Sequence, residues 1–142
     1  MGKPPVWFYI AGAILVLWES IGCLMYLSQM MITAEGMAQL PAAQRDLWMA
    51  MPSWVTSVYA IAVWVGLAGA LMLLMRFKIA RSMLIVSLAA VVVQFGWVFA
   101  MTPILTTTGP KAAIFPMAII AVGVLAVWFA GRSAANGWLR SR

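Results

Sequence analysis

The sequence predicts an all-α integral membrane protein, a bundle of four transmembrane helices that run up-down-up-down. Hydrophobic residues make up 65% of the 142 residues and charged residues 8%, with a mean hydropathy of +1.02. Soluble domains have about 45–50% apolar and about 25% charged residues. A soluble core of this length could not hide so much apolar surface. The apolar residues also gather in four runs, each close to the roughly 20 residues that cross a bilayer.

Each of the four runs is interrupted by few polar residues. The first run contains Glu19, but it is longer than the apolar segment of a signal peptide, and no A-x-A cleavage site follows it. We therefore interpret it as a span. The four predicted spans cover residues 7–30, 54–75, 80–101 and 112–130, within a single domain of residues 1–142.

The connections differ in length. Arg76, Lys78 and Arg81 form a tight basic connection that forces the second and third helices to be antiparallel. Residues 102–111 contain Gly109 between prolines, which is typical of a turn. Only the first outer loop, residues 31–53, is long.

The long loop contains a second helical pattern. Thr33 is a candidate cap for a short helix. Further on, one helical face carries apolar residues and the other carries Gln44, Arg45 and Asp46. The apolar face consists of Leu40, Ala43, Leu47 and Met51. We expect a short interfacial helix that lies on the membrane surface, with Trp48 at headgroup depth.

The distribution of positive charge predicts the orientation. Seven of the nine Lys and Arg residues fall on one side of the four predicted spans, and only Arg45 and Lys111 fall on the other. The seven are Lys3, Arg76, Lys78, Arg81, Arg132, Arg140 and Arg142. Because loops rich in Lys and Arg stay in the cytoplasm, we expect a multi-pass protein of a bacterial inner membrane with both termini cytoplasmic.

Composition also argues against several classes of function. The chain has no histidine and one cysteine, Cys23, so it cannot form an intrachain disulfide, and we expect no cofactor and no metal site. No nucleophile–base pair can be assembled, which indicates that the chain is not an enzyme. The net charge of +6 is scattered between apolar runs, a pattern that does not indicate nucleic acid as a partner.

Glu19 is the residue most suggestive of function. It lies about 18 Å along the first predicted span from Trp7, near the middle of a roughly 30 Å hydrocarbon core. A carboxylate there costs about 2.5 kcal/mol or more, so such groups usually face a bundle interior and serve proton or solute pathways. The alternative is a protonated carboxyl that only hydrogen-bonds neighbouring helices together. The sequence favours neither reading.

Three further residues complete the candidate site. Tyr26 lies two turns beyond Glu19 on the same stripe, and on the third span Gln94 and Trp97 share another stripe with Ser87. Counting along each helix places Gln94 at a depth similar to that of Glu19, which predicts a hydrogen bond between them. The candidate polar site is therefore Glu19, Tyr26, Gln94 and Trp97.

One stretch resembles a known family. The run Met51-Pro52-Ser53-Trp54-Val55-Thr56, the later Tyr59 and Gly66, and Gln94 are similar to small bacterial four-helix membrane proteins that genome annotation often calls sugar transporters. The likeness spans residues 7–101, and it implies a transport class without a mechanism. An amide is more usual in that family where Glu19 stands.

Two functions are consistent with these observations. The first is a small transporter or facilitator for a neutral or cationic solute, acting as a homo-oligomer because four helices leave little room for a cavity. The alternative is a non-catalytic accessory subunit that packs on other subunits of a larger membrane complex. In both cases the bilayer is the first partner.

Overall fold

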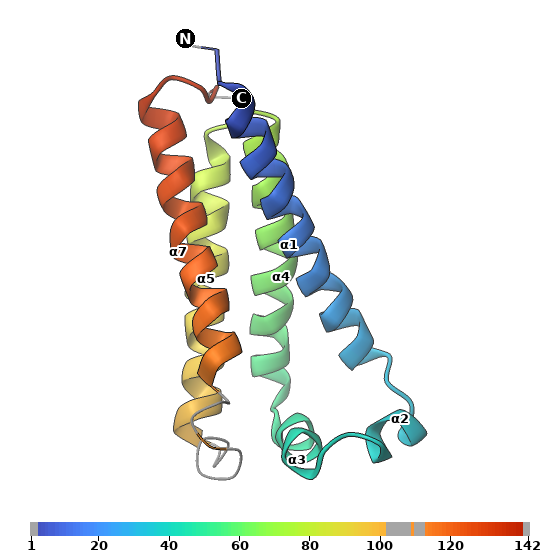
Figure 1. Cartoon of the computed structure of the whole chain (residues 1–142). Helices are drawn as coiled ribbons and strands as arrows, with labels where there is room; N and C mark the ends of the chain where they lie inside the picture. Colours follow the sequence, from blue (N-terminus) through green and yellow to red (C-terminus); the bar gives the residue numbers. More distant parts are fainter. Residues whose placement is uncertain (1–2, 102–108, 110–112, 141–142) are drawn as a thin grey trace.

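The computed structural model describes residues 3–101, 109 and 113–140, and this part of the chain folds into helices without a strand (Figure 1). The helices are α1 (Val6–Met30), α2 (Ala34–Ala38), α3 (Ala42–Ala50), α4 (Ser53–Leu74), α5 (Ile79–Met101) and α7 (Ile114–Ala135). Four of them, α1, α4, α5 and α7, are long and apolar enough to cross a membrane. The prediction of an all-helical chain with four such helices is confirmed.

The helix ends follow from local sequence. Pro5 precedes α1 and Pro52 precedes α4, positions where the missing N–H of proline breaks no helical hydrogen bond. Thr33 caps α2 as expected, because its Oγ1 accepts a hydrogen bond of 3.0 Å from the N–H of Gly36. The helix α7 continues past the predicted end at residue 130, since the first charge ends an apolar run but not a helix. The predicted turn 102–111 lies outside the described residues except for Gly109, whose φ is +93°.

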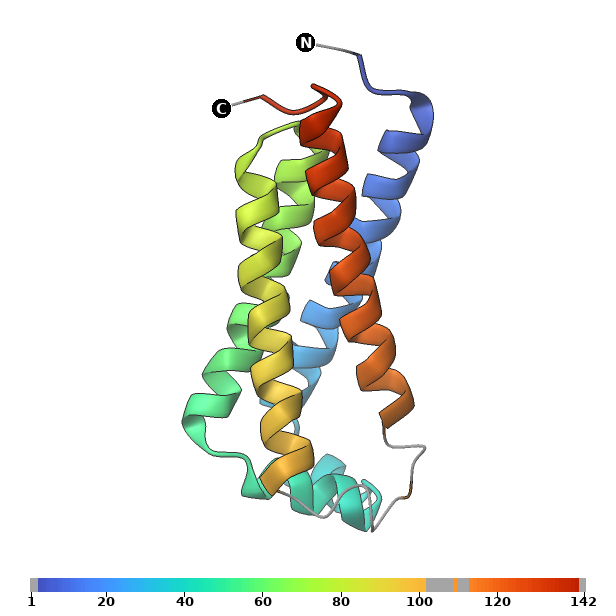
Figure 2. The ribbon, with the colours of Figure 1, turned by 90° about the vertical axis from the view of Figure 1, so that its left-hand side faces the viewer.

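The main contacts join the four long helices in a row, and α1 also meets α7 at one end, where the rings of Phe8 and Phe129 lie 5.6 Å apart. The helix α1 packs on α4, α4 on α5, and α5 on α7. Both described ends of the chain lie at one end of the bundle, and α2 and α3 lie at the other (Figures 1 and 2). From the first end to the second, α1 leans away from α7 (Figure 1). The bundle is therefore narrow at one end and wide at the other.

The narrow end, called the closed end below, is built from interlocked large side chains. Its residues are Trp7, Phe8, Leu73, Phe129, Trp138 and Leu139. The side chains of Phe8 and Leu73 are fully buried. The ring of Trp138 lies 5.3 Å from that of Trp7 and 5.8 Å from that of Phe8, centroid to centroid, in edge-on geometry.

Backbone hydrogen bonds tie the segment after α7 to the turn between α4 and α5. Gly137, with a φ of +75°, reverses the chain after α7. The N–H of Lys78 then donates to the carbonyl of Arg140 at 2.7 Å, and the N–H of Arg140 donates to the carbonyl of Arg76 at 2.5 Å. Arg76 adopts a φ of +67°, uncommon for a residue with a side chain, and its Nε donates to the carbonyl of Trp138 at 2.8 Å.

Candidate functional site

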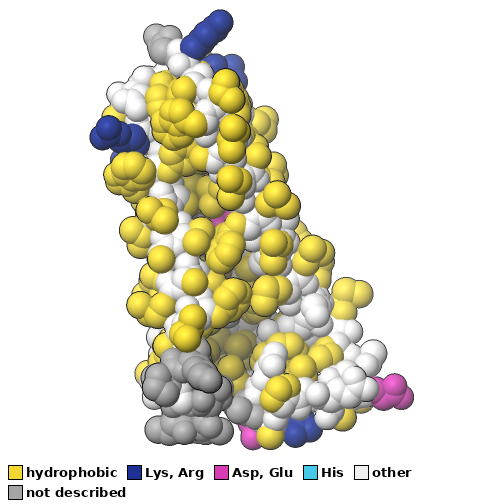
Figure 3. All heavy atoms as spheres, viewed as in Figure 1, with side chains coloured by type: hydrophobic (Ala, Val, Ile, Leu, Met, Phe, Trp, Pro, Cys, Tyr) yellow, Lys and Arg dark blue, Asp and Glu magenta, His cyan; other side chains and the backbone are white. Residues whose placement is uncertain are grey.

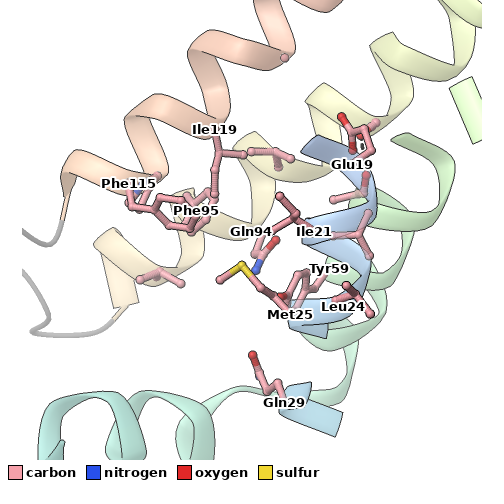
Figure 4. A pocket seen from close by; sticks show the side chains of 18 of the residues that line it. Glu19, Ile21, Leu24, Met25, Gln29, Tyr59, Gln94, Phe95, Phe115 and Ile119 are labelled. Atoms are coloured by element: carbon pink, nitrogen blue, oxygen red, sulfur yellow. Dashed lines mark hydrogen bonds between the residues drawn. The ribbon is translucent and has the colours of Figure 1, made fainter. Parts of the chain in front are cut away.

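A cavity of about 690 Å³ lies among the four long helices, and α3 contributes to its wall at the wide end (Figure 4). Its volume is within the range of about 300–1,000 Å³ that is usual for ligand sites. Most of its lining is apolar. It is open on one face, because four large side chains of the lining are about half exposed. These are Ile21, Leu24 and Met25 on α1 and Phe115 on α7. Figure 3 shows this face hollowed between the two helices.

Glu19 lines the cavity near the closed end, in a space that Gly66 leaves free. Gly66 lies on α4 opposite Glu19, and a methyl group at this glycine would collide with the Glu19 carboxyl and lie 2.8 Å from the Ser87 hydroxyl of α5. The three residues therefore meet where α1, α4 and α5 come together. The Ser87 hydroxyl donates a hydrogen bond of 2.5 Å to the carbonyl of Ala62. The absence of a side chain at Gly66 thus admits a carboxyl group between the helices.

A second polar level lies farther along the cavity. Gln94 on α5 is only 7% exposed, and its side chain points into the cavity on the side where Met25 and Tyr59 lie (Figure 4). Beyond it, Gln29 on α1 and Gln44 on α3 line the wide end. The Nε2 of Gln29 donates to the sulfur of Met51 at 3.9 Å, which links the end of α1 to the residue that ends α3.

The predicted hydrogen bond between Glu19 and Gln94 is not among the hydrogen bonds of the described residues. Glu19 lies at the level of Ser87, two helical turns or about 10.5 Å of α5 from Gln94. The depth estimate was wrong because α1 begins farther out than its neighbours. Gly12 already lies against Leu74, the last residue of α4. The two residues share one cavity at different levels.

Two of the four predicted site residues do not line the cavity. Tyr26 lies on the edge of α1 that meets α4, where its ring packs edge-on against Tyr59 at 5.1 Å and Trp64 at 6.4 Å. Trp97 is partly buried on α5 but does not line the cavity. The stripe of α1 that faces the cavity passes through Gly22 and Met25 instead, with Glu19 on its edge.

The apolar face of α3 also has a different neighbour from the one expected. Leu40, Leu47 and Met51 line the cavity, and so does Trp48. Gln44, which we placed on the opposite face, lines it as well. The sequence signal was correct as a helix with an apolar side, but periodicity does not reveal whether such a side meets lipid or protein.

One carboxyl group determines the charge of the described cavity lining. Glu19 is the only acidic residue of its described lining, which contains no Lys or Arg, and Tyr59 is the other titratable group of that lining. Cys23, one turn from Glu19, is buried, and its thiol donates to the carbonyl of Val63 at 3.3 Å. Within residues 3–101, 109 and 113–140, no three His, Cys, Asp or Glu residues are placed to hold a metal ion. The site can therefore offer one carboxyl group, amides and hydroxyls within apolar walls.

Comparison with known proteins adds no family. No family model, curated protein or solved structure matches the chain. The resemblance to small four-helix proteins stays a prediction, and the proposals below rest on this chain's own residues.

Proposed function

We propose that the protein is a small membrane transporter or facilitator that binds a neutral or cationic solute in this cavity, with Glu19 as its polar site. One observation carries the proposal: a carboxyl group sits in a ligand-sized cavity between four membrane-length helices, in space that Gly66 leaves free. An ionisable group in such a position usually serves a solute or proton pathway. The described lining of the cavity contains no Lys or Arg that could neutralise the Glu19 carboxylate. A cationic solute could therefore pair with it.

Glu19 also has the surroundings of a group that can exchange a proton with a solute. Cys23 from α1 is a titratable group near it, and Tyr59 from α4 lines the same cavity farther along, on the side of Gln94. The side that α5 presents carries the Ser87 hydroxyl, and the described lining from α7 consists of Phe115, Pro116, Ile119, Gly123 and Ala126. Protonation of Glu19 would therefore change the charge of the cavity from negative to neutral, which is the basis of proton-coupled transport.

The decisive test compares two substitutions at Glu19 in purified protein reconstituted into liposomes. Glu19→Gln keeps the size and most hydrogen bonds but removes the titration. If Glu19 is a proton site, solute flux falls or loses its pH dependence while thermal stability in detergent is retained. If it only joins helices, Gln serves as well as Glu, and Glu19→Leu is the damaging change, by about 1–3 kcal/mol.

Glu35→Gln provides the control, because Glu35 lies on α2 outside the cavity lining. A fully active Glu19→Gln protein with an unchanged pH response would end the proton-coupling proposal. Inactivity of the wild type toward a broad panel of solutes at every pH would count against transport itself.

We further propose that the four helices cross a bacterial inner membrane up-down-up-down with both termini in the cytoplasm, and that α3 lies at the outer surface. The charge distribution supports this orientation. Six of the described Lys and Arg residues belong to the closed end or the segments beside it, and Glu35 and Asp46 belong to α2 and α3 at the other end (Figure 3). Reporters attached after Arg140 and near Gln39 test this topology, since finding both on one side of the membrane would contradict it.

The second candidate function is an accessory subunit of a larger membrane complex. The open face between α1 and α7 supports it, because a helix from a partner, or from a second copy in a homo-oligomer, could cover the exposed Leu24 and Phe115. Purification in a mild detergent separates the candidates. Stoichiometric foreign polypeptides favour the subunit, and one polypeptide, as a monomer or homo-oligomer, favours the transporter.

A further inference from the structure

The opening of the cavity lies along the apolar interior of α1 and reaches the first turn of α7 at the wide end. Its rim residues Ile21, Leu24 and Met25 belong to the interior of α1, and each is between 46% and 66% exposed. Phe115 on α7 completes the rim and is 50% exposed. In a membrane, the three rim residues of α1 lie in the interior of a span and face hydrocarbon. A molecule that enters through this opening therefore comes from the lipid phase.

The cavity is elongated, with Glu19 toward one end, Gln29 and Gln44 toward the other, and Gln94 between them. Glu19 and Gln29 are separated by ten residues of α1, or about 15 Å of helical rise. Between these levels the walls are formed largely by apolar side chains, among them Met25, Val91 and Ile119. A short hydrophilic solute would leave this surface unmatched and would lose its own hydration. An apolar chain matches the walls over most of their length.

The end of the cavity near Glu19 determines which polar group at the end of such an apolar chain would fit. Glu19 accepts hydrogen bonds when ionised, and the described lining supplies no Lys or Arg to pair with it. A protonated primary amine has the charge opposite to that of the Glu19 carboxylate and supplies hydrogen-bond donors. A carboxylate or phosphate headgroup would instead be repelled.

We propose that the cavity binds a long-chain amphiphilic amine that enters sideways from the bilayer between α1 and α7, with its ammonium group at Glu19 and its chain along the apolar walls. The proposal rests on the function proposed above and names the class of ligand. It differs from that function in requiring the apolar chain as well as the charge.

The test measures binding by titration calorimetry to the whole protein in nanodiscs of zwitterionic lipid, with protein-free nanodiscs subtracted. The probes are dodecylammonium, dodecanol, which has the same chain without the charge, and methylammonium, which has the charge without the chain. We expect dodecylammonium to bind at least about tenfold more tightly than either other probe. Glu19→Gln should remove its advantage over dodecanol, whereas the matched Glu35→Gln variant should keep it.

The other outcomes separate this inference from the proposed function. If methylammonium binds as tightly as dodecylammonium and the binding depends on Glu19, the amphiphile proposal fails and the solute site stands. If no probe shows binding that depends on Glu19, the amphiphile proposal fails, and the liposome flux measurement with the solute panel decides the proposed function. If Leu24→Cys in a Cys23→Ala background cross-links two copies and dodecylammonium leaves the cross-link unchanged, a second copy occupies the opening and the amphiphile proposal is overturned.

Discussion

The closed end and the cavity are built from the same four helices but differ in every property that governs stability. At the closed end, aromatic rings from α1, α7 and the following segment interlock, and Phe8, Leu73 and Leu139 are at most 1% exposed. Around the cavity, some large side chains such as Leu24 are more than half exposed, and the buried positions include small or polar residues such as Gly66 and Ser87. Stability is therefore concentrated at one end and binding chemistry away from it.

The connections explain why the two regions differ. The helices α4 and α5 are joined by a turn between Leu74 and Ile79, which keeps their ends close together. Between Met30 and Ser53, by contrast, the chain includes two short helices, so the ends of α1 and α4 can separate at the wide end. A short connection favours packing, and a long one leaves room for a cavity and part of its wall.

The largest expected effect is at the closed end. Phe8→Ala should lower the free energy of unfolding by about 3–5 kcal/mol, because it leaves a cavity among the surrounding rings. The control is Leu24→Ala, which removes a side chain that is 66% exposed and should change stability by less than about 0.5 kcal/mol. Thermal unfolding in detergent measures both. Similar losses in the two variants would contradict the division of the molecule into two regions.

A smaller effect is expected where the helices make room for Glu19. Gly66→Ala should destabilise the protein by about 1–2 kcal/mol and weaken ligand binding, since the new methyl group displaces the Glu19 carboxyl or the Ser87 hydroxyl. Gly96→Ala on α5 is the matched control, because none of the described residues outside the adjacent turns of α5 lies within 4 Å of the new methyl group. There alanine should be neutral or stabilising by about 0.5–1 kcal/mol. A Gly66→Ala protein as stable as the Gly96→Ala protein would show that the Glu19 carboxyl does not occupy this space.

The smallest effect concerns the hydroxyl beside Glu19. Ser87→Ala removes the hydrogen bond to the carbonyl of Ala62 and should cost about 0.6–1.5 kcal/mol, the usual range within a membrane helix bundle. Ser57→Ala removes an exposed hydrogen bond within α4 and should cost less. Chemical or thermal unfolding of the two variants side by side checks the order. Equal losses of stability in the two variants would show that the surroundings of Ser87 are no more tightly packed than those of Ser57.

Sequence reasoning found the helices and only part of the site, for physical reasons that particular residues illustrate. Hydropathy depends on composition alone, so the four membrane-length helices followed directly from it. Glu19 and Gln94 stood out because a polar side chain in an apolar run must face something other than lipid. Tyr26 and Trp97 shared their helical stripes but line no part of the cavity, because neighbouring helices meet only part of each stripe.

The remaining site residues depend on how helices are aligned, which a single sequence does not encode locally. Ser87 belonged to the stripe of Gln94, but nothing in the sequence indicated that α1 begins farther out and so brings Glu19 to its level. Gln44 and Trp48 reach the cavity only because α3 folds across its wide end. Depth counted from each helix start is therefore a poor guide whenever one helix overhangs its neighbours.

The contacts at the closed end would allow α1 to tilt about that end of the bundle. Backbone hydrogen bonds of Lys78 and Arg140 fasten the segment after α7 to the turn between α4 and α5, whereas α1 meets that segment through ring contacts. Rings can slide and tilt against one another more easily than a backbone ladder can shear, so Phe8 is the natural pivot for α1. At 1.5 Å of rise per residue, Gln29 lies about twice as far from this pivot as Glu19 does. A small rotation of α1 about this contact would thus displace Gln29 about twice as far as Glu19 and widen the opening most at the far end.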